Sequence, residues 1–489
     1  MKNLLNKLFH LEERQASIKT ELIGGFFTFI AMCYILPVNS QILSAMGMNT
    51  AGVFMATALL SFLVSVIMGL VANYPLVLSA GMGLNAYVAY TLSSGFDSWQ
   101  QKMILVTICG LLFFILSLTP IRKIIIESIP KPLKLMISAA LGAFIFFVGL
   151  KGAGIIAPSE STLVTLGNFA DPAMSIAIIA VIVTIGLMFS KYELIQKLAV
   201  PMGILAAALV GLVLSIILKE TGHLIYQDNT WVYQIPGLEG VATTLPIAPW
   251  YPETGLKFAD FSGLQSVMFY GALDGYTGEQ FGKDLLTIFT NPISYVAIFS
   301  MIFVNIFDTT AALIVVGGAT GAMDEDGKMK NYRRAVIADA TGSVICGPLG
   351  TSTVTSFVES GVGVSMGAKT GLMAVSAGLM FLLCAFIYPI FSIFTVGSVT
   401  AAALVCVGLT IMSNAFKDLD FKDPIIAFSA IMTVLFAILC YSISNGIGFG
   451  FITYTTIMVI KHRGKEVSLP IYIISSLFIV SFVLSIFVR

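Results

Sequence analysis

Residues 351–371 read TSTVTSFVESGVGVSMGAKTG, in a chain that is otherwise rich in Leu, Ile, Val and Phe. The stretch holds one glutamate, a cluster of hydroxyl side chains and four glycines. Glycine weakens a helix, and β-branched residues such as those of STVTSFV favour an extended backbone. The sequence therefore predicts an extended lead-in and a short helix where the neighbouring stretches predict continuous helices.

The composition identifies an integral membrane protein. Of the 489 residues, 57% are hydrophobic and 11% are charged, and the mean hydropathy is +0.95. Soluble domains carry about a quarter charged residues. The formal net charge is +0 and no run is rich in Lys and Arg, which argues against a nucleic-acid partner.

Residue usage also argues against an enzyme. The three histidines, His10, His223 and His462, fall in expected loops or tails, so the membrane interior lacks the commonest metal ligand and general base. The six cysteines have no metal-ligand spacing and fit small buried hydrophobic residues. We expect no cofactor and no metal. An intramembrane enzyme that uses two carboxyl groups as acid and base is the alternative from another class.

Apolar stretches long enough to cross a bilayer recur along the chain, because a hydrocarbon core of about 30 Å needs about 20 apolar residues in a helix. In the first half they lie near 20–42, 51–72, 76–93, 103–119, 133–150, 173–190 and 197–218. In the second half they lie near 291–317, 333–349, 353–367, 370–391, 397–415, 424–443 and 446–460. We expect an all-α polytopic protein with about 14 transmembrane segments, seven in each half. A further hydrophobic segment at 468–488 either crosses the membrane or lies along it.

Basic residues in the short loops set the orientation. Clusters at residues 2–19, 122–131, 191–197, 328–334, 417–422 and 461–465 all fall on one side of the membrane if the N-terminus is cytoplasmic. The N-terminal segment mixes charges of both signs and has no small-residue cleavage site, so we expect it to be retained. The chain is therefore expected to be a multi-pass protein of the cell membrane with a cytoplasmic N-terminus.

Because each half has an odd number of spans, the second half enters the membrane in the opposite orientation to the first, as in an inverted repeat. Residues 79–84 read SAGMGL and residues 359–364 read ESGVGV, each in the third span of its half. We expect the third and tenth spans to be half strand and half helix, with the two half-helix N-termini meeting near the midplane.

Such helix ends would present N–H groups and positive dipole ends to a ligand. The expected substrate-binding residues at these ends are Ala80, Gly81, Met82, Ser360 and Gly361. Gly83 and Gly363 are expected to be structural glycines. Close helix packing through small residues is the alternative explanation for any one of these glycines.

Interior acids are the strongest signal for a site, because a charge in the hydrocarbon costs about 2.5–3.5 kcal/mol on insertion scales. The expected spans contain Asp308, Asp339 and Glu359. We expect Asp308 and Glu359 to bind substrate and to carry the coupled proton, since burial disfavours a charged carboxyl group. Asp339 follows Arg333 by six residues and fits a structural partner of that basic loop.

Asn85, in GMGLNAY, offers two hydrogen-bond donors and an acceptor to a heteroaromatic edge, and an interhelical hydrogen bond is its alternative role. Two carboxyl groups, an amide and two helix ends fit a flat, neutral solute that is rich in hydrogen-bonding groups. They fit an inorganic anion poorly, because two carboxylates would repel it.

Five motifs carry a resemblance to a known family. They are FFTFIAMCYILPVNSQIL, ANYPLVLSAGMGLNAYVAY, FVNIFDTTAALIVVGGA, GTSTVTSFVESGVGVSMGAKTGL and SISNGIGFGFITYTTIMVIK. In this order along nearly the whole chain, they closely resemble the adenine/guanine/hypoxanthine permease branch of the nucleobase:cation symporter-2 family.

The resemblance implies a seven-plus-seven inverted-repeat transporter that takes up purine nucleobases with protons. It implies a core domain at 20–119 and 291–391, a gate domain at 133–218 and 397–460, and an extracellular connection at 219–290. Relatives of this fold commonly form homodimers through the gate domain. Carried over by motif, Asp308 and Glu359 would hold the ring nitrogens and exocyclic groups of the purine, and Asn85 would support the site.

The chain departs from the family pattern close to the site. Ser79 and Ala80 stand where the family usually has Ala-Pro, Ala311 and Ala312 stand where a Gly-Thr pair usually follows FDT, and Ser40 replaces a usual proline. Xanthine, a pyrimidine base or another small polar solute therefore stays open as cargo. A passive facilitator is the alternative to a coupled transporter.

Overall fold

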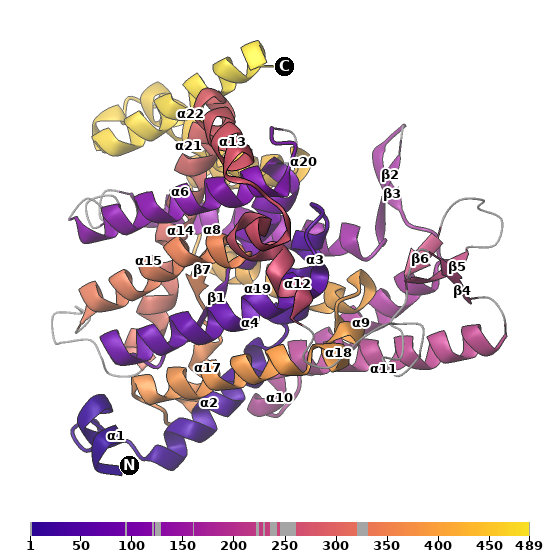
Figure 1. Ribbon diagram of the computed structural model, residues 1–489. Helices are drawn as coiled ribbons and strands as arrows, with labels where there is room; N and C mark the ends of the chain where they lie inside the picture. Colours follow the sequence, from indigo (N-terminus) through magenta and orange to yellow (C-terminus); the bar gives the residue numbers. More distant parts are fainter. Residues whose placement is uncertain are drawn as a thin grey trace.

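The structure is a computed structural model of residues 1–489. It describes residues 2–92, 95–119, 122, 129–159, 161–221, 224–227, 230–234, 242–244, 261–319 and 331–488. Most of these residues belong to helices that run side by side, with short strands at the centre and at one end of the molecule (Figure 1).

The helices and strands alternate along the chain as follows. In the first half they are α1 Lys2–Phe9, α2 Ile18–Met32, α3 Ile35–Ser44, α4 Thr50–Ile67, η1 Met68–Ala72, β1 Leu78–Ala80, α5 Met82–Ala86, η2 Tyr87–Thr91, α6 Trp99–Leu118, α8 Lys131–Gly152, β2 Ile156–Ser159, β3 Leu163–Leu166, α9 Pro172–Met188, α10 Glu193–Lys197 and α11 Ala199–Glu220. The connection contains β4 Leu224–Gln227, β5 Thr230–Gln234, β6 Ala242–Thr244, α12 Ser262–Val267, η5 Met268–Asp274 and α13 Gly278–Thr290. In the second half they are α14 Pro292–Ala319, α15 Tyr332–Leu349, β7 Val354–Ser356, α16 Ser360–Ser365, α17 Gly371–Phe386, α18 Tyr388–Phe391, η6 Ser392–Phe394, α19 Gly397–Lys417, α20 Pro424–Leu439, α21 Ile443–Ile460, η7 Gly464–Glu466 and α22 Leu469–Val488.

By length and apolar composition, eight of the described helical stretches could cross a membrane, and four shorter apolar helices accompany them. Side-chain caps fix several of their starts: the side chains of Ser17, Asn49 and Ser98 accept hydrogen bonds from the first turns of α2, α4 and α6. Such caps satisfy N–H groups that have no partner inside the helix. The polytopic helical class holds, and the count of 14 spans stays a prediction.

The first expected span is broken into two helices. Helix α2 ends at Met32 and α3 starts at Ile35, so Cys33 and Tyr34 form the junction between them. Both junction residues have right-handed helical backbone angles. Pro37, four residues after Cys33, has no N–H group to donate to the Cys33 carbonyl oxygen, which accounts for the break. This junction directs the Tyr34 side chain towards the centre of the molecule, where it is 2% exposed.

Strands β1 and β7 form an antiparallel pair at the centre of the molecule, with Leu78 opposite Ser356 and Ala80 opposite Val354. The amide of Gly81 donates to the carbonyl oxygen of Thr353 at 2.8 Å and extends the pairing by one step. Each strand runs into a short helix, β1 into α5 and β7 into α16. The two motifs that the sequence matched, SAGMGL and ESGVGV, therefore lie next to each other in space.

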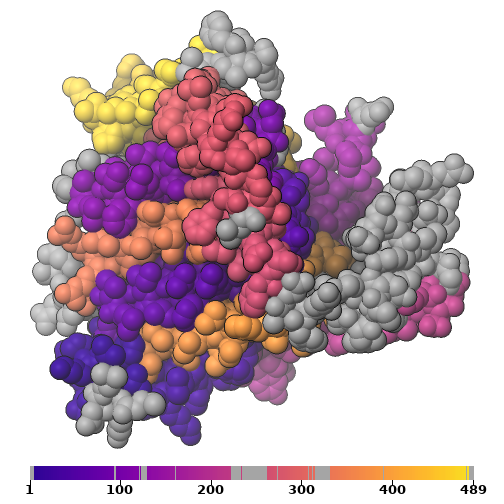
Figure 2. Space-filling model, viewed as in Figure 1, coloured from indigo at the N-terminus to yellow at the C-terminus, as the bar shows by residue number. Residues whose placement is uncertain are grey.

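The contacts divide the long helices into two bundles. In the first bundle, α6 packs against α15, and both α2 and α4 pack against α17. In the second bundle, α19 packs against α8, α9 and α11, and α20 packs against α8 and α21. Figure 2 shows purple and orange bands of the first bundle in alternation, so helices from the two halves of the chain interleave. The division into a moving core and a static gate stays a prediction.

A further acid inside the molecule, Glu21, was not expected from the sequence. It lies in the first turn of α2 and is fully buried. Its carboxylate accepts hydrogen bonds from the amides of Lys369 at 2.7 Å, Thr370 at 3.2 Å and Met373 at 3.2 Å, at the start of α17. A helix N-terminus stabilises a negative charge, so Glu21 acts as a cap that joins the two halves of the chain.

The expected extracellular connection is folded over the first bundle for the part that the structure describes. Helix α12 packs against α4, and α13 packs against α6. The side chain of Gln101 donates to Asp284 at 2.8 Å and links α6 to α13. Residues 245–260 of this connection lie outside the described residues.

The hydrophobic segment at 468–488 forms helix α22, which packs against α21 (Figure 1). Many of its apolar side chains are exposed, among them Leu469, Ile473 and Val480. Lipid can cover such a surface. Whether α22 crosses the bilayer stays open.

Gly110→Ala tests the close approach of α6 and α15. A Cβ atom at Gly110 would lie 1.8 Å from the backbone oxygen of Ser343, so the two helices would have to separate. We expect the substitution to destabilise the fold by about 1–3 kcal/mol and to lower the melting temperature of the purified protein in detergent.

Gly186→Ala in α9 is the matched control, because nothing lies within 4 Å of a Cβ atom there. Alanine is favoured over glycine in a helix interior by about 1 kcal/mol, so the control should melt at the wild-type temperature or above it. Equal melting temperatures for the two variants would contradict the proposed packing role of Gly110.

Candidate functional site

A cavity of about 360 Å³ lies between the two bundles. The first bundle contributes Met82, Gly83, Asp308, Thr355, Ser356, Phe357, Val358 and Glu359. The second bundle contributes Leu141, Ile145, Met188, Gln196, Val200, Val407, Thr410, Ile411 and Asn414. Its volume lies within the range of sites that bind small molecules, about 300–1,000 Å³.

Asp308 lines the cavity from α14. The hydroxyl group of Thr355 on β7 is hydrogen-bonded to the Asp308 carboxyl group. Because Thr355 pairs with Ser79 of β1, the same strand pair fixes the position of this hydrogen-bond partner. Asp308 is half-buried, so one side of its carboxyl group remains available to a ligand in the cavity.

Glu359 lines the same cavity from the N-cap position of α16. Its Oε1 accepts a hydrogen bond of 2.7 Å from the hydroxyl group of Tyr34. The backbone oxygen of Glu359 accepts from the amide of Val362 at 2.9 Å, which closes the first turn of the short helix. The structure thus brings the two acids predicted as the central pair into one cavity, from α14 and α16.

Asp339 is fully buried but does not line the cavity. Its carboxylate accepts hydrogen bonds from Thr309 at 2.8 Å and from Ser356 at 3.4 Å, and the buried Arg122 interacts with it electrostatically. For Asp339 the sequence analysis expected a structural role as partner of the basic loop that contains Arg333. The structure gives it partners on α14 and β7 instead, and these are the direct neighbours of Asp308 and Thr355.

The N–H groups at the two half-helix ends are largely engaged. Besides Gly81, which bonds Thr353, the amide of Ser360 donates to Phe357 at 3.2 Å and that of Gly361 to Val358 at 2.8 Å. Of the five residues predicted to bind substrate at these ends, Met82 lines the cavity. Ala80 lies within β1 and is paired with Val354.

Asn85 and Ser360 point into the first bundle. The side-chain amide of Asn85 donates to the Oδ1 atom of Asn39, and Asn39 donates in turn to Thr57 at 2.7 Å and to Thr351 at 2.9 Å. The hydroxyl group of Ser360 accepts from the amide of Val77 at 2.9 Å. For Asn85 this is the interhelical hydrogen bond that the sequence analysis kept as an alternative.

The predicted structural glycines sit at close approaches. A Cβ atom at Gly83 would lie 2.0 Å from a methyl carbon of Leu141, across the boundary between the bundles. At Gly363 it would lie 2.4 Å from the Thr28 hydroxyl oxygen and 2.6 Å from the backbone oxygen of Gly24. At Gly361 nothing lies within 4 Å, so packing does not require a glycine there.

Residues 363–367, GVSMG, match the Gly-x-Ser-x-Gly pattern of serine hydrolases. That pattern indicates a nucleophile only on a turn from a strand into a helix. Ser365 is instead the last residue of the short helix α16, and its hydroxyl group donates to the backbone oxygen of Val362 at 2.7 Å. The match is therefore not a nucleophile elbow.

The sequence analysis missed every residue that the second bundle contributes to the cavity. Thr410 and Asn414 are four residues apart on α19, so they share a helix face, and Gln196 approaches from α10. A polar pair at this spacing in an apolar helix is a usable signal. Nothing in the local sequence says which cavity such a face would meet.

The cavity can bind a flat, polar solute. Its first-bundle side carries two carboxyl groups and the hydroxyl groups of Thr355 and Ser356, and its second-bundle side carries Gln196, Thr410 and Asn414. Apolar side chains such as Met82 and Phe357 can cover the faces of a planar ring. Carboxylates accept hydrogen bonds, so they select solutes with N–H or O–H donors.

Comparisons with known proteins extend over nearly the whole chain. Residues 19–449 match the profile of the permease family. The chain is 34% identical to the guanine/hypoxanthine permease PbuO of Bacillus subtilis, over 97% of this chain and 99% of that one. It is 31% identical to the adenine permease AdeP of Escherichia coli, over 98% and 96% of the two chains.

The fold is similar to a solved structure of an anion transporter. The transmembrane domain of the cyanobacterial bicarbonate transporter BicA superposes with a TM-score of 0.55. The match covers 87% of this chain and 97% of that one at 15% identity, so it concerns the fold alone.

Thr309→Val tests the hydrogen bond that Asp339 receives beside the cavity. The variant removes a donor at 2.8 Å and leaves a buried carboxylate with one fewer partner. An unsatisfied buried polar group costs about 1–3 kcal/mol, so the melting temperature of the purified protein should fall.

Thr341→Val on α15 is the control, because within the described part of the chain the Thr341 hydroxyl group bonds only the Ile337 carbonyl oxygen of its own helix, at 2.8 Å. This variant should melt close to the wild type. If the two variants are equally stable, Thr309 does not support Asp339.

Proposed function

Because this chain belongs to the permease family, we propose that it imports purine nucleobases across the cell membrane by proton symport. Hypoxanthine, guanine and adenine are the proposed substrates. The curated relatives are guanine/hypoxanthine and adenine permeases and match over nearly their full length, which supports this substrate class.

The observation that carries the proposal is the shared cavity of Asp308 and Glu359. A purine base presents ring N–H groups and, in guanine and adenine, an exocyclic amine. Two carboxyl groups from different helices can accept hydrogen bonds from two edges of one base, and each good contact to a charged group contributes about 1.5–3 kcal/mol. Asn85 would act indirectly, through Asn39 and Thr351, which precedes β7.

Proton coupling follows from the same two acids. A carboxyl group in a cavity inside the membrane is costly as a charge and gains a proton more readily than one in water. Binding of a proton to Asp308 or Glu359 would leave the pair with a single negative charge. Loss of that proton on the cytoplasmic side would leave two like charges in the cavity and favour release of the base together with the proton.

We propose that the site is exposed alternately to the two sides as the first bundle, acting as core domain, moves past the second bundle, acting as gate domain. Gln196 and Asn414 border the cavity close to Lys197 and Lys417, which the orientation expected from the sequence assigns to the cytoplasm. The cavity would then open inward.

A contact between the bundles on the opposite side supports this direction. The hydroxyl group of Thr91 donates to the backbone oxygen of Tyr441 at 3.0 Å, and the Tyr90 and Tyr441 rings lie 5.6 Å apart. Phe144 and the ammonium group of Lys151 also contact the Tyr441 ring. We propose that this aromatic cluster closes the extracellular path in the inward-facing state.

Two further properties belong to the same proposal. The N-terminus lies in the cytoplasm, and two copies associate through the gate domain, by analogy with relatives of this fold. The orientation decides which side is the cytoplasm in the mechanism above. The association of two copies does not enter it, because the residues that line the cavity come from one chain.

The test is uptake of radiolabelled hypoxanthine, guanine and adenine by cells that lack their own purine permeases, with and without an uncoupler. We expect accumulation that the uncoupler abolishes. Asp308→Asn and Glu359→Gln should each lower uptake at least about tenfold, because each removes a charge-assisted contact. Glu466→Gln, at an exposed acid between α21 and α22, should behave as the wild type.

Inactivity of the wild type towards all three bases would reject purine transport and favour another small polar solute. Uptake that equilibrates without accumulation would indicate a facilitator. Wild-type rates in both acid variants would reject the assignment of the site.

Tyr441→Ala tests the extracellular closure. Removal of the ring should open a path from the outside to the cavity. In a protein that carries Thr355→Cys, the new thiol group should therefore react with a membrane-impermeant reagent several times faster when Tyr441 is replaced by alanine than when Tyr441 is present. The native cysteines, Cys33, Cys109, Cys346, Cys384, Cys406 and Cys440, are replaced by serine or alanine in the background. Equal rates would show that Tyr441 does not close the path.

A further inference from the structure

Tyr34 contacts both the proposed site and the boundary between the bundles. It stands at the junction of α2 and α3, is 2% exposed, and donates its hydroxyl group to Glu359 at 2.7 Å. Tyr34 lies within the motif FFTFIAMCYILPVNSQIL, where the sequence suggests an aromatic neighbour of the site but assigns no role to the hydroxyl group. A phenylalanine would fill the same space, so packing alone does not account for the oxygen atom.

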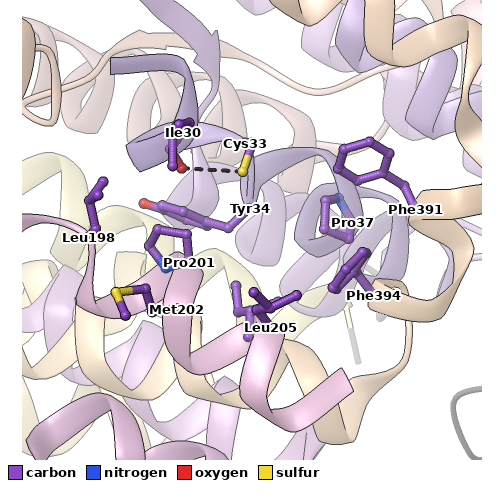
Figure 3. Close-up of a pocket in the computed structure, with 11 residues that line it drawn as sticks. Ile30, Cys33, Tyr34, Pro37, Leu198, Pro201, Met202, Leu205, Phe391 and Phe394 are labelled. Atoms are coloured by element: carbon purple, nitrogen blue, oxygen red, sulfur yellow. Dashed lines mark hydrogen bonds between the residues drawn. The ribbon is translucent and has the colours of Figure 1, made fainter. Parts of the chain in front are cut away.

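The Tyr34 ring borders a second cavity, of about 240 Å³. This cavity is almost wholly apolar, and its wall includes Pro201 and Met202 from helix α11 of the second bundle and Leu198 at the N-cap of that helix. Figure 3 shows the ring beside Pro201, with Leu198 and Met202 near its hydroxyl end. One residue therefore joins the Glu359 carboxylate to a helix of the opposite bundle.

We propose that Tyr34 is a positioning residue that holds Glu359 for the purine base, and that helix α11 keeps its ring in place only while the two bundles are in the present arrangement. The inference rests on the proposed purine transport and goes beyond it. It links the hydrogen bonding of one substrate ligand to the relative position of the bundles.

The geometry gives this link a physical basis. A carboxylate at the start of a short helix can rotate about its side-chain bonds, and one strong donor on Oε1 fixes its plane and leaves Oε2 for the substrate. In apolar surroundings the Tyr34 hydroxyl group needs an acceptor, and Glu359 is the one that the described residues provide.

The cavity gives the ring room to move when α11 shifts. Protein interiors are close-packed, so a ring with about 240 Å³ of free space beside it has fewer contacts than a fully packed ring, and Pro201 lies beside it (Figure 3). If α11 slides along the first bundle, Pro201 leaves the ring and Glu359 loses a fixed donor. The affinity of the site for the base would then fall in the state from which the base departs.

Tyr34→Phe removes only the hydroxyl group, and KM and Vmax of purine uptake are measured for it and the wild type. We expect KM to rise about tenfold, the effect of losing one charge-assisted hydrogen bond, with a smaller change in Vmax. A loss of folded protein alone would lower Vmax and leave KM unchanged. Tyr388→Phe is the matched control, since the Tyr388 ring is buried against Phe54 and its hydroxyl group has no hydrogen-bond partner among the described residues.

The link to α11 is tested by a double-mutant cycle. Leu198→Ala combined with Met202→Ala should loosen the ring and raise KM severalfold, and should add little when Tyr34 is already phenylalanine. Leu209→Ala on the outer face of α11, where the side chain is 55% exposed, should leave KM unchanged.

The outcomes separate the two proposals. If the wild type takes up purine bases and Tyr34→Phe has the same KM as the wild type, the role of Tyr34 is overturned and the proposed function stands. If Tyr34→Phe raises KM, and its effect and that of the Leu198→Ala/Met202→Ala variant multiply when all three substitutions are combined, the link to the second bundle is overturned. If the wild type transports no purine base, the proposed function and this inference both fall.

Discussion

Backbone polar groups inside a membrane must find partners within the protein, and the pairing of β1 with β7 meets this demand at the centre of the molecule. The two strands come from opposite halves of the chain, and Leu78, Ser79 and Ala80 face Ser356, Thr355 and Val354. Neither strand could exist alone in hydrocarbon, because its edge would be unsatisfied. The first bundle therefore has to hold both halves together before a site can form.

The pairing of β1 with β7 also positions the partners of the acidic side chains. Thr355 on β7 meets Asp308 of α14, and Ser356 beside it meets Asp339 of α15, so adjacent residues of one strand serve a cavity acid and a buried acid. Glu359 follows one short turn later and is held by Tyr34. Hydrogen bonds from Thr309, Thr355 and Ser356 thus connect β7, α14 and α15, and the bond from Tyr34 ties the start of α16 to the junction of α2 and α3. Such sets of hydrogen bonds are rigid when every member is paired.

The sequence predicted the helical membrane class, the two strand-to-helix motifs and the acid pair, because each leaves a local signal. A carboxyl group in an apolar run is costly unless it has a partner or lines a cavity, and glycines next to β-branched residues indicate a break in a helix. The sequence did not indicate Glu21 as buried, since an acid in a first helical turn usually faces water. It also assigned Ser360 and Asn85 to the ligand, although both side chains bond within the first bundle.

By itself, then, the sequence determined which residues are too polar for their surroundings and how the two halves correspond. The tertiary structure alone decided which partners those residues meet. Thr410, Asn414 and Gln196 became cavity residues, and Tyr34 became the partner of Glu359, through packing between segments up to several hundred positions apart. The periodicity of polar and apolar residues in the sequence indicates on which face of its own helix a residue lies. Which other element packs against that face depends on how all the helices fill space together.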